Sequence, residues 1–200
     1  MEPLEICVDA SLKEIDGRKF GCSGAYCINN NMESYMISPD TTNNRSELLA
    51  IYIGIKLAEK IFKQQAGMYS NIIIYSDSQF GVYGLTKWIH NWIGSQDRNG
   101  VFFGSNNIYV KLYHQQGHVK YTSTKSLNNA NKVFYNSNGF YLKPEDIYKI
   151  SYYNDLIDNK SRNKLNYVRS EDYPFIDYHP NINDNRIGYK IPPKFYQYIS

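Results

Sequence analysis

The 200-residue sequence has few cysteines, no long apolar run and little net charge. Cys7, Cys22 and Cys27 are an odd number without C-x-x-C spacing, so we expect neither a disulfide framework nor a cysteine metal site. No apolar stretch approaches the roughly 20 residues of a membrane span, and residues 1–5 are acidic, unlike a signal peptide. We therefore expect a protein of a reducing compartment, the cytoplasm, nucleoid or nucleus, without membrane contact.

The small net charge of +3 is unevenly placed. Residues 1–159 are balanced, whereas residues 160–200 carry seven basic and four acidic side chains. A neutral body with a basic end is a weak indication of an acidic partner. The length is enough for one domain with a sizeable core.

The hydrophobic pattern predicts an alternation of strands and helices. The expected strands are 5–10, 20–28, 32–38, 71–76 and 108–114. The expected helices are 44–64, 78–93 and 143 to about 165. Residues 11–18 read as a turn, residues 121–142 have no clear period, and residues 166–200 read as an irregular tail. An antiparallel meander followed by β-α-β units predicts an α/β protein with a five-stranded mixed sheet and helices on both faces.

Four carboxylates stand out by their placement in these elements. Asp9 lies near the end of the first strand, Glu47 in the first turn of a helix, Asp77 directly after a buried strand and Asp158 in the last helix. The first three can converge at one end of the sheet. Clustered carboxylates repel one another unless a cation is present, and Mg²⁺ suits a few carboxylates that share it with a phosphate.

Each acid also has a purely structural interpretation. Glu47, three residues after Asn44, has the spacing of a capping pair. Asp77 could be an N-cap, and Asp158 could be an exposed helix acid. Asp9 is hardest to explain in this way, because an unpaired acid at the end of a core strand is costly.

Several segments resemble the ribonuclease HI family. Thr41–Leu48 is similar to the start of the family's first helix, and Ser76–Phe80 followed by Trp88–Trp92 is similar to its fourth strand and next two helices. Val8–Ser11 matches the D-G-S motif of the first strand, with alanine where glycine is usual. Asn154-x-x-x-Asp158 matches the asparagine and fourth acid of the last helix in type and spacing.

The resemblance implies an RNase H-like fold and an enzyme that hydrolyses the RNA strand of RNA–DNA hybrids, leaving 3′-hydroxyl and 5′-phosphate ends. It implies two Mg²⁺ ions, with Mn²⁺ as a substitute, held by Asp9, Glu47, Asp77 and Asp158. His118 would be the histidine that assists proton transfer, with His114 as the competing candidate and an ordinary polar loop residue as the alternative. We expect the protein to act as a monomer.

The resemblance also implies a set of substrate contacts. They are Ser11, Thr42, Asn43, Asn44, Arg45, Gln79, Trp88, Trp92 and Asn154. The two tryptophans also have the spacing of a buried aromatic pair on a helix.

The sequence departs from the family in three places. The segment after Trp92 lacks the lysine cluster of many bacterial members, few residues separate Trp92 from Ile108, and 39 residues lie between His118 and Asp158. We therefore predict a catalytic domain at 1–165 with an atypical insertion at about 119–150, no separate N-terminal hybrid-binding module, and a Tyr- and Pro-rich tail at 166–200. The tail either packs on the body or binds nucleic acid.

Two other functions stay open at this point. One is a nuclease of the same fold that cuts DNA, such as a resolvase or an exonuclease. The other is a non-catalytic nucleic-acid binding module. The Thr41–Leu48 segment argues against the first, and four intact acids, which repel phosphate, argue against the second.

Overall fold

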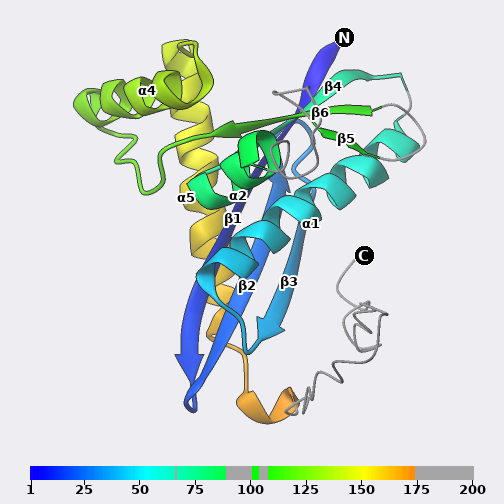
Figure 1. Ribbon diagram of the computed structural model, residues 1–200, viewed down its shortest axis with the longest axis vertical. Coiled ribbons are helices and arrows are strands. Elements are labelled where there is room, and N and C mark those ends of the chain that lie inside the picture. Colours follow the sequence, from blue (N-terminus) through cyan, green and yellow to red (C-terminus); the bar gives the residue numbers. More distant parts are fainter. Residues whose placement is uncertain (66, 89–100, 104–107, 174–200) are drawn as a thin grey trace.

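The computed structural model describes residues 1–65, 67–88, 101–103 and 108–173 (Figure 1). The strands are β1 (Glu2–Ile15), β2 (Arg18–Cys27), β3 (Glu33–Pro39), β4 (Tyr69–Ser76), β5 (Val101–Phe103) and β6 (Ile108–His114). The helices are α1 (Asn43–Gln64), α2 (Gln79–Tyr83), the π-helical turn η1 (Gly84–Trp88), α4 (Thr124–Asn138), α5 (Pro144–Leu165) and the 3₁₀ turn η2 (Ser170–Asp172).

The strands form one mixed sheet in the order β3-β2-β1-β4-β6-β5. β1, β2 and β3 pair antiparallel, β4 lies parallel to both β1 and β6, and β5 is antiparallel to β6. The predicted mixed α/β architecture is confirmed. The three-residue β5 adds a sixth strand to the five expected, and it is too short to show a pattern in the sequence.

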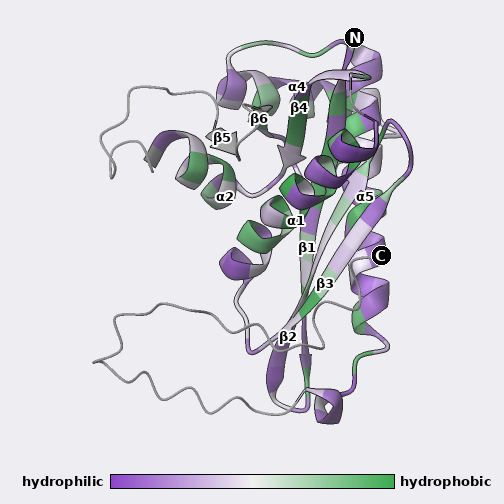
Figure 2. Cartoon of the chain, turned by 90° about the vertical axis from the view of Figure 1, so that its right-hand side faces the viewer, coloured by the Kyte–Doolittle hydropathy of each residue, from purple (hydrophilic) through white to green (hydrophobic). Residues whose placement is uncertain are grey.

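Helices cover both faces of the sheet, as predicted. α1 packs on β1, β2, β3 and β4, and α5 packs on β1 and β2 from the opposite side (Figure 2). Because side chains alternate along a strand, Ile6 and Val8 enter the core beside α1, whereas Cys7 enters the core beside α5. Asp9 follows on the side of Cys7 and so projects toward α5.

The turn predicted at residues 11–18 is much shorter in the structure. β1 continues to Ile15, and only Asp16 and Gly17 separate it from β2. Both residues have positive φ, 51° and 74°, as a two-residue hairpin turn requires. The prediction was too wide because exposed Lys13 and Glu14 belong to the strand and not to the loop.

α1 begins one residue before the predicted start, and its cap differs from the prediction. Thr42 is the N-cap, and its side-chain oxygen accepts a hydrogen bond from the Arg45 backbone N–H at 3.3 Å. The predicted pair of Asn44 and Glu47 was wrong, because Asn44 is already inside the helix. Glu47 therefore does not take part in the N-cap of α1.

The segment in which the sequence showed no period contains a 15-residue helix, α4. Ser123 caps its start, and Gly139, with φ of 87°, ends it. Ala130 and Phe134 are its only buried side chains among the described residues, and such a narrow apolar stripe within Asn and Ser gives a weak periodic signal. α4 packs on β6 and α5.

α5 confirms the predicted last helix at both ends. Pro144 opens it, and Glu145 and Asp146 lie in its first turn, where proline is tolerated and acids favour the helix dipole. The helix expected at 78–93 is present as α2 followed by η1, and residues 89–93 lie outside the described part. No helix of the described chain is long and apolar enough to cross a membrane.

The start of the predicted tail packs on the β1–β2 hairpin. Arg18 donates hydrogen bonds to the carbonyl oxygens of Ser170 and Tyr173, and the rings of Phe20 and Tyr173 meet edge to face at 5.5 Å. Residues 174–200 lie outside the described part, so the nucleic-acid alternative for the tail stays a prediction. The domain boundaries also stay predictions.

Candidate active site

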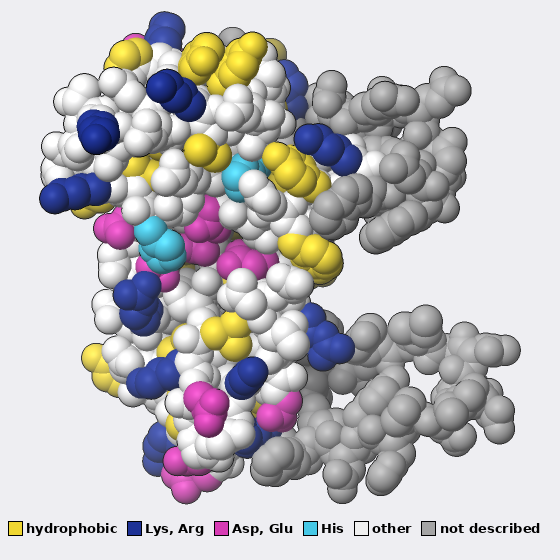
Figure 3. Space-filling view, turned by 60° about the vertical axis from the view of Figure 1, so that its left-hand side comes forward, with side chains coloured by type: hydrophobic (Ala, Val, Ile, Leu, Met, Phe, Trp, Pro, Cys, Tyr) yellow, Lys and Arg dark blue, Asp and Glu magenta, His cyan; other side chains and the backbone are white. Residues whose placement is uncertain are grey.

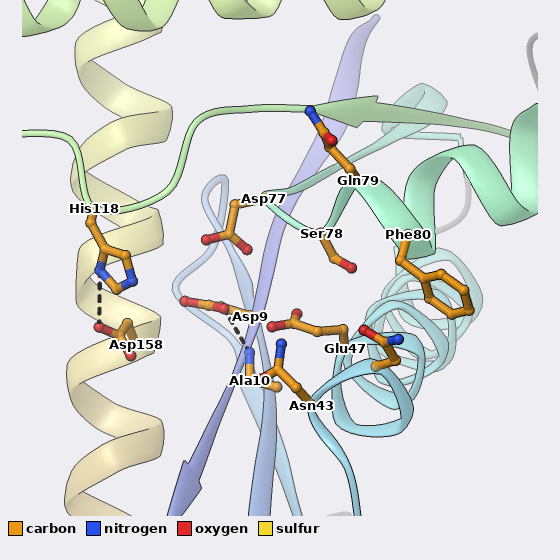
Figure 4. A pocket seen from close by; sticks show the side chains of 11 residues that line it. Asp9, Ala10, Asn43, Glu47, Asp77, Ser78, Gln79, Phe80, His118 and Asp158 are labelled. Carbon is orange, nitrogen blue, oxygen red and sulfur yellow. Dashed lines mark hydrogen bonds and ion pairs between the residues drawn. The ribbon is translucent and has the colours of Figure 1, made fainter.

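Three carboxylates from three elements meet at one edge of the sheet. β1 and β4 run parallel with Val8 opposite Ser76, so Asp77, which directly follows β4, lies beside Asp9. Asp9 itself lies within β1, which continues to Ile15, and not near the end of its strand as predicted. Glu47 reaches this edge from the second turn of α1. One oxygen of each carboxylate lies within 4.8 Å of an oxygen of the other two, and Figure 4 shows the three groups pointing toward one another.

Burial makes this group of acids electrostatically unfavourable on its own. Asp9 is 4% exposed and Glu47 is 7% exposed. Burial, followed by the nearby charges of Asp77 and Glu47, raises the pKa of Asp9 well above its usual range. Burial and the charges of Asp77 and Asp158 raise the pKa of Glu47 to about 8. Burial also raises the pKa of Asp77, although His118 and Asn154 offset part of this effect.

The donor set fits a hard divalent cation. Carboxylate oxygens are the ligands that such cations prefer, and Oε2 of Glu47 is buried without a hydrogen-bond partner. A buried acceptor without a partner is costly, and a bound cation would remove this cost along with the mutual repulsion. Asp9, Glu47 and Asp77 could therefore hold a metal ion.

Asp158 lies beside this group and has partners of its own. It comes from α5, accepts a hydrogen bond from Ser11 Oγ at 2.8 Å and forms an ion pair with Arg162. The Nδ1 atom of His118 lies 3.7 Å from its Oδ2 atom. Asp158 therefore has an ion-pair partner, which no described residue provides for the other three acids.

The four acids share a hollow of about 380 Å³. Its lining is Asp9, Ala10, Asn43, Asn44, Glu47, Asp77, Ser78, Gln79, Phe80, His118 and Asp158. The hollow thus combines the four predicted acids with three of the predicted substrate-contact residues, all bearing amide side chains. In Figure 3 the magenta carboxylates lie in a recess between two lobes of the surface.

The remaining predicted residues lie around the hollow or beneath it. Asn154 is buried, and its Nδ2 donates a hydrogen bond to Asp9 Oδ2 at 3.2 Å. Ser11 is buried under Asp158. Thr42 and Arg45 are exposed at the start of α1 and do not line the hollow. Trp92 and the side chain of Trp88 lie outside the described part.

The two candidate histidines have different surroundings. His118 lines the hollow, and its side chain is 75% exposed. His114 is 3% exposed, its Nδ1 lies 2.8 Å from Ser137 Oγ, and burial lowers its pKa. Only His118 has the access that a proton-transfer group needs.

The sequence did not reveal how closely the loop after β6 covers Asp77. Gly117 approaches so closely that a Cβ atom at this position would lie 2.1 Å from Asp77 Oδ2. His118 follows with φ of 51°, which is uncommon for residues other than glycine. The Gly117-His118 pair was a signal for a tight loop.

Arg162, four residues after Asp158, was also overlooked, although that spacing pairs charges on a helix.

Comparison with known proteins agrees with this geometry. The family model described as RNase H matches residues 1–140, and the chain belongs to the RNase H family. Ribonuclease H of Rickettsia akari is 43% identical over 76 residues, which cover 37% of this chain and 45% of that protein. Ribonuclease H of Hahella chejuensis is 35% identical over 95 residues, covering 46% and 57%. The matches thus span about half the length of these relatives.

Among solved structures, a crystal structure of LC9-RNase H1, described as a type 1 RNase H with the type 2 active-site motif, is 17% identical with a TM-score of 0.42. The alignment covers 81% of this chain and 86% of that one. A likeness this distant carries no argument about activity.

Proposed function

We propose that this protein is a ribonuclease H that hydrolyses the RNA strand of RNA–DNA hybrids, with divalent metal ions at the carboxylate cluster. The observation that carries the proposal is the meeting of Asp9, Glu47 and Asp77 within 4.8 Å in a chain of the RNase H family. A site built only for phosphate binding would not contain three clustered acids, two of them buried, because they repel phosphate.

Asp9, Glu47 and Asp77 would hold the metal, with Asp158 as a fourth ligand where two ions bind. We propose Mg²⁺ as the ion and Mn²⁺ as its substitute. When bound, such ions activate water and stabilise the charge that develops on the phosphate and on the leaving oxygen. The products would be a 3′-hydroxyl and a 5′-phosphate.

Neighbouring side chains would position these acids and move the proton. The Asn154 amide donates to Asp9, and Ser11 donates to Asp158, so both carboxylates are held in fixed orientations. His118 is exposed beside Asp158. Its imidazole can deliver a proton to the leaving 3′-oxygen and exchange it again with solvent.

Substrate selection would come from the amides in the hollow. Asn43, Asn44 and Gln79 present donors and acceptors on the α1 and α2 side of the acids. The minor groove of an A-form-like hybrid is wide and exposes 2′-hydroxyl groups, which such amides can bind. Thr42 and Arg45, exposed at the start of α1, would contact phosphates of the DNA strand, and Trp88 and Trp92 would line its path. The protein would act as a monomer.

The test is a cleavage assay on matched RNA–DNA, RNA–RNA and DNA–DNA duplexes, each with Mg²⁺ and with EDTA. The proposal requires Mg²⁺-dependent cleavage of the hybrid in its RNA strand, abolished by Asp77→Asn. Asp16→Asn, in the distant β1–β2 turn, is the matched control, because Asn tolerates the positive φ there. Preferred cleavage of duplex DNA would indicate a DNA nuclease, and hybrid binding without turnover would indicate a binding module. Either result would refute the proposal.

A further inference from the structure

The segment between β6 and α5 has a charge unlike the rest of the body. Residues 115–143 contain Lys120, Lys125, Lys132 and Lys143 and no Asp or Glu, whereas residues 1–159 as a whole are balanced. The sequence gives no acidic residue between Asp97 and Glu145. The positive charge is therefore local, and it lies in the segment that was expected to be an insertion.

These four lysines are exposed and have no ion-pair partner among the described residues. Two lysines of α5 differ, since Lys149 pairs with Glu5 and Lys160 with Glu33. An exposed ion pair contributes little to stability. The two groups of lysines therefore differ chiefly in whether the ammonium group is already paired with a carboxylate of the protein. The lysines of 115–143 are exposed and can therefore contact an external anion.

The helix α4 directs two of these lysines to one side. Lys125 and Lys132 are seven residues apart, two turns of a helix, and therefore share a face. The buried Ala130 and Phe134 lie on the opposite face. Packing of α4 on β6 and α5 thus leaves both lysines pointing outward.

This charged segment is continuous with the candidate active site. The loop from β6 to α4 places His118 in the active-site hollow, and His118 also lines a second hollow of about 350 Å³. The second hollow is lined by His118, Val119, Lys120, Tyr121, Thr122 and Asp155. Figure 3 shows dark blue side chains on the lobe above the magenta carboxylates.

Tyr121 gives the second hollow a fixed wall. Its ring meets those of Tyr148 and Tyr152 edge to face, at 5.7 and 5.6 Å. These contacts tie the loop to α5, the helix that carries Asp158. Lys120 is therefore held at a defined position relative to the acids and not on a free loop.

We propose that Lys120, Lys125 and Lys132, which we call the α4 surface, bind the sugar–phosphate backbone of the nucleic-acid duplex beyond the cleavage site. This inference rests on the proposed function, because the α4 surface would be a second binding site for the same nucleic-acid duplex. The α4 surface takes the place of the lysine cluster that is missing after Trp92. Its charge is complementary to a polyanion, and the two hollows, which share His118, lead from the acids to Lys120 in the loop before α4.

The test is the salt dependence of hybrid binding, measured by fluorescence anisotropy in EDTA, so that binding does not depend on cleavage. The Lys120→Gln/Lys125→Gln/Lys132→Gln variant is compared with wild type from about 50 to about 300 mM salt. Each phosphate contact contributes about −0.9 to the slope of log K against log salt, so three lost contacts should flatten the slope by roughly 2 units or more. In Mg²⁺ the same variant should show a raised KM and an unchanged kcat.

Two controls make the result specific. Lys13→Gln/Lys19→Gln/Lys63→Gln removes the same charge from exposed positions elsewhere and should leave the slope unchanged. Replacement of the three α4-surface lysines by arginine should retain the wild-type slope, since the charge is kept. Melting temperatures check that all variants fold.

A wild-type slope in the Gln variant would overturn the inference, and so would an equal flattening in both Gln variants. Suppose that the wild type does not cut the hybrid but the salt slope changes only in the Gln variant of the α4 surface. The binding role of the α4 surface would then be supported and the proposed function refuted. If the wild type cuts the hybrid and the salt slope does not change in that variant, only the binding role of the α4 surface would be refuted.

Discussion

The two sides of the active-site hollow hold their acids in different ways. On the side of β1, β4 and α1, three carboxylates are packed together with raised pKa values. On the side of α5, Asp158 is paired with Arg162 and Ser11 and faces the exposed His118. The first side is electrostatically unfavourable without a cation, whereas Asp158 on the second side has an ion-pair partner in Arg162. The two sides therefore differ in whether the protein itself supplies a positive partner for the carboxylate charge.

The largest expected effect comes from removing one charge on the side of β1, β4 and α1, where we propose that the metal binds. Asp77→Asn should lower kcat at least about a thousandfold, because a metal site supplies several kcal/mol of transition-state stabilisation and each 1.36 kcal/mol is tenfold in rate. The same variant should melt at a higher temperature in EDTA, since carboxylate repulsion is relieved. Single-turnover cleavage and thermal melting measure the two effects. Substantial turnover of Asp77→Asn in Mg²⁺ would refute the site.

On the α5 side, His118→Ala should slow hydrolysis without abolishing it. General acid–base assistance is typically worth about 10²–10⁴-fold, and this substitution leaves the proposed metal ligands in place. His114→Ala is the matched control, and it should retain kcat but lose stability, because His114 is buried and bonded to Ser137. The opposite pattern in the two variants would show that the wrong histidine was assigned.

A smaller effect should come from the loop that joins the two sides. Gly117→Ala places a methyl group against Asp77 Oδ2, so the carboxylate must move, and we expect kcat to fall about tenfold, the scale of a 1.4 kcal/mol perturbation. Gly139→Ala is the control, because strain at its positive φ should lower stability and leave kcat unchanged. Equal kcat values in the two variants would argue against a close approach of the loop to Asp77.

A separate prediction concerns the pH dependence of metal-free stability. The folded-state pKa of Glu47, about 8, lies above its ordinary value of 4.5. The folded protein therefore binds more protons than the unfolded chain between these values, and stability must fall as pH rises through this range. Thermal melting in EDTA at pH values from about 5 to about 8 should show this fall, and Glu47→Gln should reduce it. A melting temperature that rises with pH equally in both proteins would contradict the assignment.

The sequence predicted the meeting of Asp9, Glu47 and Asp77 better than it predicted the surroundings of Asp158 on α5. The apolar strands and one long amphipathic helix were recognisable in the sequence. Their order predicted that Asp9, Glu47 and Asp77 converge at one end of the sheet. Each of these elements is defined by a local hydrophobic pattern. Once the elements are known, the β-α-β order places their ends side by side in the sheet. The capping role of Thr42 was missed because Asn44 offers an equally good local spacing, and only tertiary packing decides between them.

The α5 side depends on contacts that a sequence does not display. α4 has a narrow apolar stripe formed by residues such as Ala130 and Phe134, so its period was not recognised. The close approach of Gly117 to Asp77 joins residues 40 positions apart and could not be deduced from either segment alone. The pairing of Ser11 with Asp158 spans 147 positions and depends on how α5 crosses the sheet.

The most direct test of the central claim is calorimetric titration of the protein with Mg²⁺, and with Mn²⁺, in two buffers of different ionisation enthalpy near pH 7. If Asp9, Glu47 and Asp77 together hold the cation, binding must displace protons from acids with raised pKa values, so the measured heat will differ between the buffers. Asp77→Asn should abolish binding and Asp16→Asn should not. Cation binding without proton release, equal in both variants, would contradict the account.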